Sequence, residues 1–152
     1  MVWPDDLVGM ILATVLGAVI GLEREIHGKA AGLRTNLLIC LGAAVFTIIS
    51  REMATGAENS VTRIAAQIVT GVGFLGAGAI IQDRGGVHGL TTAATIWLVA
   101  SIGMACGARF YQLATISTLI TIIVLVGLGK LSKHLDRFTG KHKRSRAADE
   151  LD

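Results

Sequence analysis

Acidic and basic side chains gather near the ends of several apolar stretches of this 152-residue sequence, where they could pair or hold a cation. Glu23 and Glu25 flank Arg24 at the end of one stretch, and Asp83 follows another. Mg²⁺ prefers carboxylate oxygens together with waters that it keeps, whereas charges at membrane depth usually pair with one another. The pattern therefore predicts salt bridges that lock helix ends, a cation site, or a polar surface for a partner.

Neutral polar residues at neighbouring ends of the stretches belong to the same predicted cluster. We expect nine candidate functional side chains to lie together at the cytoplasmic face: Glu23, Arg24, Glu25, Arg34, Thr35, Asn36, Asp83, Thr91 and Thr92. Among them, Glu23, Glu25 and Asp83 are the candidate metal ligands.

The interiors of the apolar stretches contain few polar residues. The candidates there are Gln67 and Thr95, together with a few further hydroxyl groups, and no carboxylate occurs inside a stretch. An ion-driven transporter usually places ionisable groups near the membrane centre. This pattern weighs against a driven pump and leaves a passive pore open.

The sequence shows no pattern typical of an enzyme. None of the four histidines stands at metal-site spacing from a second ligand, and Cys40 and Cys106 are predicted to be small packing residues. The glycine-rich segment Gly71–Gly78 lacks the Lys-Ser/Thr pair of a phosphate-binding loop. We therefore expect no catalytic residues and no resident cofactor, with Mg²⁺ as a ligand at most.

The elements that must position these residues are long apolar helices. Hydrophobic residues make up 52% of the chain and charged residues 16%, against about 25% charged in typical soluble domains. Crossing a membrane takes about 20 helical residues, with a lower limit of about 17. The two shortest charge-free stretches reach this length only if Arg24 and Arg34 lie within their helix ends. Five stretches carry no Asp, Glu, Lys, Arg or His: Leu7–Leu22, Thr35–Ser50, Ile64–Gln82, Gly89–Ala108 and Phe110–Gly129.

These stretches predict an all-α membrane protein with five transmembrane helices, surrounded by the lipid bilayer. Residues 1–129 would form the transmembrane domain and residues 130–152 a short basic juxtamembrane tail. Because basic residues concentrate in cytoplasmic segments, the tail predicts an outside N-terminus and an inside C-terminus. The same tail accounts for the net charge of +3, so we expect no nucleic-acid partner.

Glycines recur at helical spacing inside the stretches and predict close helix contacts, because small residues let two backbones approach in lipid. These contacts could lie within one chain or between copies, with a homodimer expected. A further interpretation takes Gly71–Gly78 as an unwound segment that lines a site. The predicted packing glycines are Gly9, Gly17, Gly21, Gly71, Gly73, Gly76, Gly78 and Gly103.

Several blocks of the sequence, in order, resemble the MgtC/SapB family of bacterial inner-membrane proteins. The resemblance covers roughly residues 9–128 and is carried by Gly21–Glu25 (GLERE), Ala31–Asn36 (AGLRTN), Arg63–Val69 (RIAAQIV), Gly71–Gly78 (GVGFLGAG) and Gly89–Trp97 (GLTTAATIW), followed by Gly103.

The resemblance implies a five-span bundle with an outside N-terminus and a role in growth at low magnesium. The family's namesake is thought to restrain the rotary ATP synthase rather than to carry magnesium. An acidic functional residue of the family matches Asp83. Two departures set this chain apart, since Thr91 stands where virulence-associated members have Asn and Leu98 where they have Cys. Many members also carry a cytoplasmic ACT-like domain, whereas this sequence has a short tail.

Two functions of different classes fit these observations. The first is a non-catalytic membrane regulator that binds another membrane complex, such as the ATP synthase, through small-residue helix faces and its polar end. The second is a small oligomeric channel or transporter for Mg²⁺ or another cation. A regulator should capture a partner without moving ions, whereas a transporter should move Mg²⁺ alone.

Overall fold

The computed structural model of the chain describes residues 4–54, 58–83 and 86–129, with side chains described for these residues except 58–64 and 83. The predicted basic tail, residues 130–152, lies outside the described residues. In chain order the elements are α1 (Pro4–Ile26), α2 (Leu33–Met53), α3 (Glu58–Gly78), β1 (Ile81–Asp83), β2 (Gly86–His88), α4 (Leu90–Gly107), α5 (Tyr111–Ile123) and the π-helix η1 (Val124–Leu128).

Each predicted apolar stretch lies mainly in a helix, which confirms a largely helical protein. Four segments are long and apolar enough to cross a membrane, namely Pro4–Ile26, Leu33–Met53, Leu90–Gly107 and Tyr111–Leu128. In α3 the described apolar part, Ala65–Gly78, is shorter. Arg24 lies inside α1 and Arg34 inside α2, as their stretches require to reach spanning length.

The third stretch differs from the prediction, because its helix ends at Gly78 rather than continuing to Gln82. The chain then forms a hairpin in which β1 pairs antiparallel with β2, with Gln82 opposite Val87. Two physical features favour this ending. β-Branched residues such as Ile81 and Val87 suit strands, and Gly86 supplies a φ of +124° at the turn.

Gly89 closes the connection between the hairpin and α4. Its φ of +88° is a left-handed conformation that suits glycine. A Cβ atom at this position would also overlap the carbonyl oxygen of Ala79. This close approach fixes where α3 ends relative to the start of α4.

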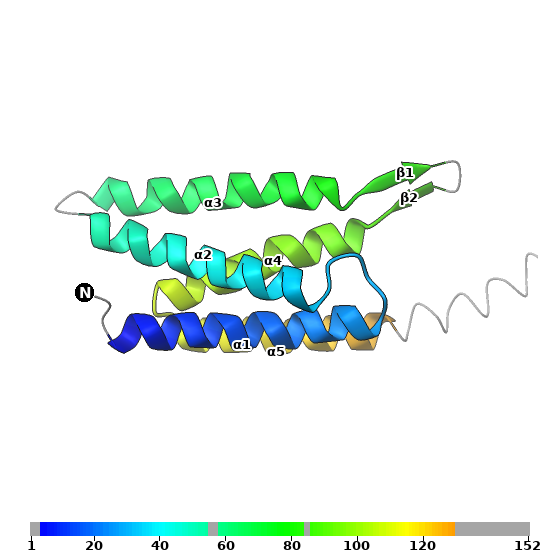
Figure 1. The fold of residues 1–152 in the computed structure, drawn as a ribbon, viewed down its shortest axis with the longest axis horizontal. Coiled ribbons are helices and arrows are strands. Elements are labelled where there is room, and N and C mark those ends of the chain that lie inside the picture. Colours follow the sequence, from blue (N-terminus) through cyan, green and yellow to red (C-terminus); the bar gives the residue numbers. More distant parts are fainter. Residues whose placement is uncertain (1–3, 55–57, 84–85, 130–152) are drawn as a thin grey trace, which may run out of the picture. The chain divides into compact units, whose positions relative to one another are not determined.

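The chain divides into two compact units, residues 1–118 and 119–152, and the boundary falls within α5. In the first unit, successive helices α1 to α4 run in alternating directions (Figure 1). Helix α4 contacts α1, α2 and α3, and ten of its residues are buried. The described part of the second unit consists of the end of α5 and η1.

Small residues bring α1, α2 and α4 into backbone contact. Cys40 of α2 packs between Gly17 of α1 and Gly103 of α4. A Cβ atom at Gly17 would lie 2.7 Å from the Cβ of Cys40, and one at Gly103 would overlap the Cys40 carbonyl oxygen. We call α1, α2 and α4 the packed trio.

Three further glycines extend this packing along the trio. A Cβ atom at Gly9 would lie 2.8 Å from the carbonyl oxygen of Cys106, and one at Gly21 would lie 2.8 Å from the Cα of Leu33. Gly107 lies against the backbone of Ala44 in the same way. No side chain larger than hydrogen fits at these positions without a shift of backbone.

Helix α3 packs against α2 and α4 more loosely. Ile68 is buried in a cluster with Ala43 and Ala100, but nothing lies within 4 Å of a Cβ atom built at Gly71, Gly73 or Gly78. Because α3 stays helical through Gly71–Gly78, the interpretation of this segment as unwound is wrong.

Candidate functional site

A buried arginine lies at the centre of the predicted polar end. Arg24 occupies the last turn of α1 and is 3% exposed. Its Nη2 donates a hydrogen bond to Oγ1 of Thr92, 3.1 Å away in the first turn of α4. The bond links the end of one predicted stretch to the start of another, so these two candidate residues meet.

Glu23 provides the negative charge nearest to Arg24. Its Oε2 lies 3.9 Å from Nη1 of Arg24, and its Oε1 lies 3.1 Å from Nδ1 of His27. Sequence reasoning left His27 out of the cluster, although its position four residues after Glu23 places both on one helix face. We call Glu23, Arg24, His27 and Thr92 the Arg24 cluster.

Two other candidates hold the loop between α1 and α2. Oε2 of Glu25 accepts a hydrogen bond of 2.9 Å from the backbone N–H of Leu33, at the start of α2. Asn36 is fully buried, and its Nδ2 donates to the carbonyl oxygens of Ala31 and Gly32 at 2.7 and 2.8 Å. Because helix starts have unpaired N–H groups, the Glu25 carboxylate is engaged in capping α2.

Three buried polar atoms at this end make no hydrogen bond within the described part of the chain. They are Oε2 of Glu23, Nε of Arg24 and Oδ1 of Asn36. Such atoms in a native protein generally have an ordered water or another polar group as partner. These two oxygen acceptors and one nitrogen donor are suited to water or to a polar group of another molecule.

The remaining candidates are placed differently. Arg34, Thr35 and Thr91 are exposed on the first turns of their helices, and Arg34 makes no ion pair within the described residues. Asp83 ends β1, and its side chain lies outside the described part. Among the described residues, no group of three His, Cys, Asp or Glu side chains lies close enough together to hold a metal ion.

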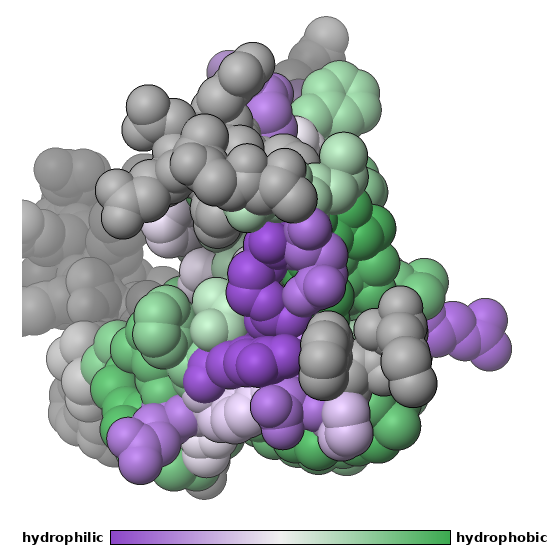
Figure 2. Space-filling model, turned by 90° about the vertical axis from the view of Figure 1, so that its left-hand side faces the viewer, coloured by the Kyte–Doolittle hydropathy of each residue, from purple (hydrophilic) through white to green (hydrophobic). Residues whose placement is uncertain are grey.

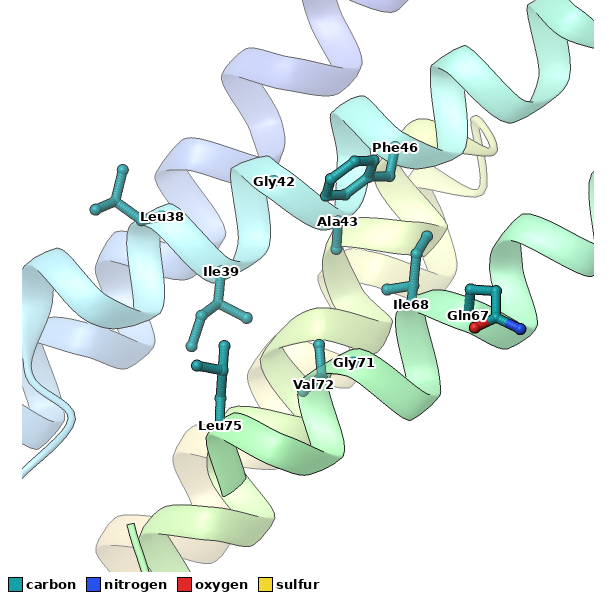
Figure 3. Close-up of a pocket in the computed structure, with 10 residues that line it drawn as sticks. All are labelled: Leu38, Ile39, Gly42, Ala43, Phe46, Gln67, Ile68, Gly71, Val72 and Leu75. Atoms are coloured by element: carbon teal, nitrogen blue, oxygen red, sulfur yellow. The ribbon is translucent and has the colours of Figure 1, made fainter. Parts of the chain in front are cut away.

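The two polar candidates inside the stretches also differ from each other. Thr95 is buried, and its Oγ1 donates to the carbonyl oxygen of Thr91 at 2.8 Å. Gln67 is exposed on α3 and lines an apolar cavity of about 600 Å³ between α2 and α3 (Figure 3). Its amide has no hydrogen-bond partner within the described chain.

The opposite end of the first unit holds a second charged cluster that sequence reasoning missed. Asp6 is 2% exposed and forms ion pairs with Arg51 at the end of α2 and with Arg109 after α4. Nη1 of Arg51 also donates to the Gly107 carbonyl oxygen at 2.8 Å. We call Asp6, Arg51 and Arg109 the Asp6 cluster. Figure 2, which views this end of the molecule, shows hydrophilic surface in the middle flanked by hydrophobic surface.

Arg109 is held in an unusual conformation by this cluster. Its φ of +67° is left-handed, which is rare for a residue with a side chain. Its Nη2 donates to Oδ1 of Asp6 at 3.0 Å, and this bond raises the pKa of Arg109 above its ordinary value. Arg109 therefore stays charged and joins the α4–α5 connection to the start of α1.

The apolar helices, with charged clusters at both ends of the first unit, define a multi-pass membrane protein. The model of the MgtC family matches residues 10–134. The chain belongs to this family.

Curated relatives agree with this assignment. The chain is 47% identical over 112 residues to Protein MgtC of Brucella abortus, a match that covers 74% of this chain and 46% of that protein. It is 42% identical over 131 residues to Protein MgtC of Salmonella typhimurium, covering 86% and 55%. It is 43% identical over 127 residues to YhiD of Escherichia coli, covering 80% and 59%.

The chain thus spans about half the length of the curated relatives that it matches. The description of YhiD gives magnesium transport as a candidate role for that protein. No solved structure matches the chain significantly.

Proposed function

We propose that this protein is a non-catalytic regulator in the bacterial inner membrane, linked to adaptation to low magnesium, that binds another membrane complex. Family membership supports the link to magnesium. The candidate partner is the rotary ATP synthase, which the resemblance to the family suggests. The five helices would span the membrane with the N-terminus outside and the C-terminus inside.

The observation that favours regulation over transport is the packing of the trio. Gly17 and Gly103 bring backbones together around Cys40, so this interface leaves no room for a hydrated ion. The cavity between α2 and α3 is lined by nine apolar residues and Gln67. Mg²⁺ gives up its waters reluctantly, and an apolar cavity offers it no replacement ligands.

The Arg24 cluster would be the contact with the partner. Its buried oxygen and nitrogen atoms without hydrogen bonds could pair with polar groups of another protein. The nearby exposed residues Arg34, Thr35 and Thr91 would extend that surface into the cytoplasm.

The alternative is a small oligomeric transporter for Mg²⁺ or another cation. The candidate role given for YhiD and the Oε2 of Glu23, which accepts no hydrogen bond within the described residues, favour it. In that case the ion would pass between copies of the chain, since the packed trio is closed.

Reconstitution separates the two functions. Purified protein in vesicles should leave a magnesium-sensitive dye inside unchanged when Mg²⁺ is added outside. Cross-linking in native membranes should capture ATP synthase subunits, and Thr91→Arg should reduce that capture. Rapid Mg²⁺ entry into vesicles that hold this protein alone would favour the transporter.

Membrane orientation has its own test. Reporter fusions at each end of the chain should be active outside the cell at the N-terminus and inside at the C-terminus. The reverse result would place the Arg24 cluster on the outer surface, where a cytoplasmic partner could not reach it.

A further inference from the structure

The cavity between α2 and α3 opens at the surface of the first unit. It has a volume of about 600 Å³, and Leu38 and Phe46 of α2, which line it, are 63% and 58% exposed. Figure 3 shows these two side chains on one wall and Leu75 of α3 on the other, with Gln67 at the far end of the labelled row. We call this space the α2–α3 cavity.

The walls of the α2–α3 cavity suit an apolar occupant. A Cβ atom built at Gly42 of α2 or at Gly71 of α3 would meet no described atom within 4 Å. A buried water needs about two to four polar partners, whereas nine apolar residues and Gln67 line the cavity. Because lining atoms that face empty space lose their dispersion contacts, hydrocarbon in this space would stabilise the walls.

A positive charge lies one helical turn from this cavity. Arg34 precedes Leu38 by four residues, so the two residues lie on the same side of α2. Arg34 is exposed in the first turn of the helix and makes no ion pair within the described residues. The carboxylate of Glu25 in the preceding segment accepts from the backbone N–H of Leu33 instead. The cavity therefore has apolar walls along its length and a cation at one end.

The distance from Arg34 to the far end of the cavity is similar to the depth of one membrane leaflet. Phe46 follows Arg34 by about three helical turns, a rise of about 18 Å at about 1.5 Å per residue. One leaflet contributes about 15 Å of hydrocarbon, half of a core about 30 Å thick. A lipid with its headgroup at Arg34 could therefore place one acyl chain along the cavity.

We propose that the α2–α3 cavity binds one acyl chain of an anionic phospholipid whose phosphate group pairs with Arg34. Basic residues near a membrane surface attract anionic headgroups, and a guanidinium group can bind phosphate through two parallel hydrogen bonds. A helix of another molecule could also cover the apolar walls, but only one with an acidic group at the same depth would pair with Arg34. The charge beside the cavity therefore favours the lipid. This inference goes beyond the proposed regulatory function, and its test contains no partner protein.

Photochemical labelling in vesicles tests whether the lipid occupies this site. The full chain is reconstituted in phosphatidylcholine vesicles with a trace of phosphatidylglycerol that carries a photoreactive group near the end of one acyl chain. The matched probe is phosphatidylcholine with the same photoreactive chain. Phosphatidylglycerol should label the cavity walls, residues 38–46 and 67–75, more strongly than the matched probe does. Both probes should label the exposed side of α1 around Val15, which is 51% exposed, to the same extent.

Charge substitutions test the headgroup contact. Arg34→Gln should lower the ratio of phosphatidylglycerol to phosphatidylcholine labelling at the cavity walls about fivefold, as expected for the loss of one basic residue at an anionic surface. Lys29→Gln removes another exposed charge, from the segment between α1 and α2, and should leave this ratio unchanged. Equal losses in the two variants would show a general attraction of this surface for anionic lipid and would contradict a defined site.

Filling the cavity tests the acyl-chain contact. Gly42→Phe places a ring in the open space beside its Cβ and should reduce phosphatidylglycerol labelling of residues 67–75 to the level seen on the exposed side of α1. Gly71→Phe fills the same cavity from the opposite wall and should reduce the labelling of residues 38–46 in the same way. The control, Val15→Phe, adds the same ring on α1 and should leave the labelling of both walls unchanged.

Three results would overturn the proposal: equal labelling of the cavity walls by the two probes, unchanged labelling after the cavity is filled, or no labelling of the walls by either probe. The last result would show that protein rather than lipid covers the cavity. Thermal unfolding of each variant in detergent shows that the fold is retained. A loss of labelling in a folded Gly42→Phe or Gly71→Phe variant therefore supports an acyl chain in the cavity.

Discussion

Helices α1 and α3 both carry glycines at helical spacing, yet the structure uses these glycines in opposite ways. In α1, Gly9, Gly17 and Gly21 each meet a neighbouring helix or loop so closely that a Cβ atom would require a shift. In α3, Gly71 and Gly73 face open space. Equal spacing in the sequence therefore does not distinguish glycines that pack against a neighbouring helix from glycines that face open space.

The neighbours of the glycines distinguish the two cases. On α1 the residues outside the glycine stripe are large and exposed, such as Ile11 and Val15, so this helix has one packing face and one lipid face. On α3 the exposed residues mix small side chains with the larger Val69, Phe74 and Leu75.

The largest expected effect comes from the ion pairs that join the trio at one end. Asp6→Ala would leave Arg51 and Arg109 without their shared carboxylate and should lower the free energy of unfolding by about 3–5 kcal/mol. Asp5→Ala removes a more exposed partner of Arg109 and should cost less than about 1 kcal/mol. Denaturation in mixed detergent micelles measures both, and equal losses would show that Asp6 has no special role.

A matched pair of glycine substitutions tests whether the glycines of α1 are packed more tightly than those of α3. Gly17→Leu should destabilise the monomer by about 3 kcal/mol, because overpacking forces the backbone around Cys40 to move. Gly73→Leu places the same side chain in open space and should change stability by less than about 0.5 kcal/mol. Similar losses in the two variants would mean that α3 is packed as tightly as α1.

The hydrogen bond between α1 and α4 should have a smaller effect. Thr92→Val removes the hydroxyl that accepts from Arg24 and should cost about 2 kcal/mol, as expected for a bond to a charged group. Thr91→Val alters an exposed neighbour and serves as the control. Unchanged unfolding of Thr92→Val would show that the Arg24 guanidinium finds another partner.

The smallest effect on stability is expected at an exposed residue of α3. Phe74 is 82% exposed, so Phe74→Ala should change the unfolding free energy of the monomer by less than about 0.5 kcal/mol. A destabilised monomer would instead place Phe74 in a contact within the chain.

Much of the fold could be predicted from the sequence because membrane helices are long runs of residues without charge. Runs without charge mark α1, α2, α4 and α5, and Arg24 and Arg34 fall inside helix ends as the length of a membrane span requires. The end of α3 could not be predicted in this way. Hydropathy treats Ile80 and Ile81 as helix continuation, whereas their β-branched shape and the turn at Gly86 favour a hairpin.

The sequence predicted the Arg24 cluster at one end of the bundle better than the Asp6 cluster at the other. Arg24 and Thr92 meet because alternating helices bring the ends of neighbouring stretches to one face. The same argument applies to Asp6, Arg51 and Arg109, which lie at the opposite ends of the same helices. Arg34 was expected among the carboxylates and is exposed, because Glu25 binds the α2 backbone at Leu33 instead.

The close approach of Gly89 to Ala79 has a consequence for how such proteins can diversify. This contact fixes the end of α3 relative to the start of α4. The glycine contacts of the packed trio do not involve α3. Substitutions along the outward side of α3 can therefore accumulate without disturbing the rest of the scaffold. Over evolutionary time, the exposed surface of α3 can change while α1, α2 and α4 keep the packing of the bundle.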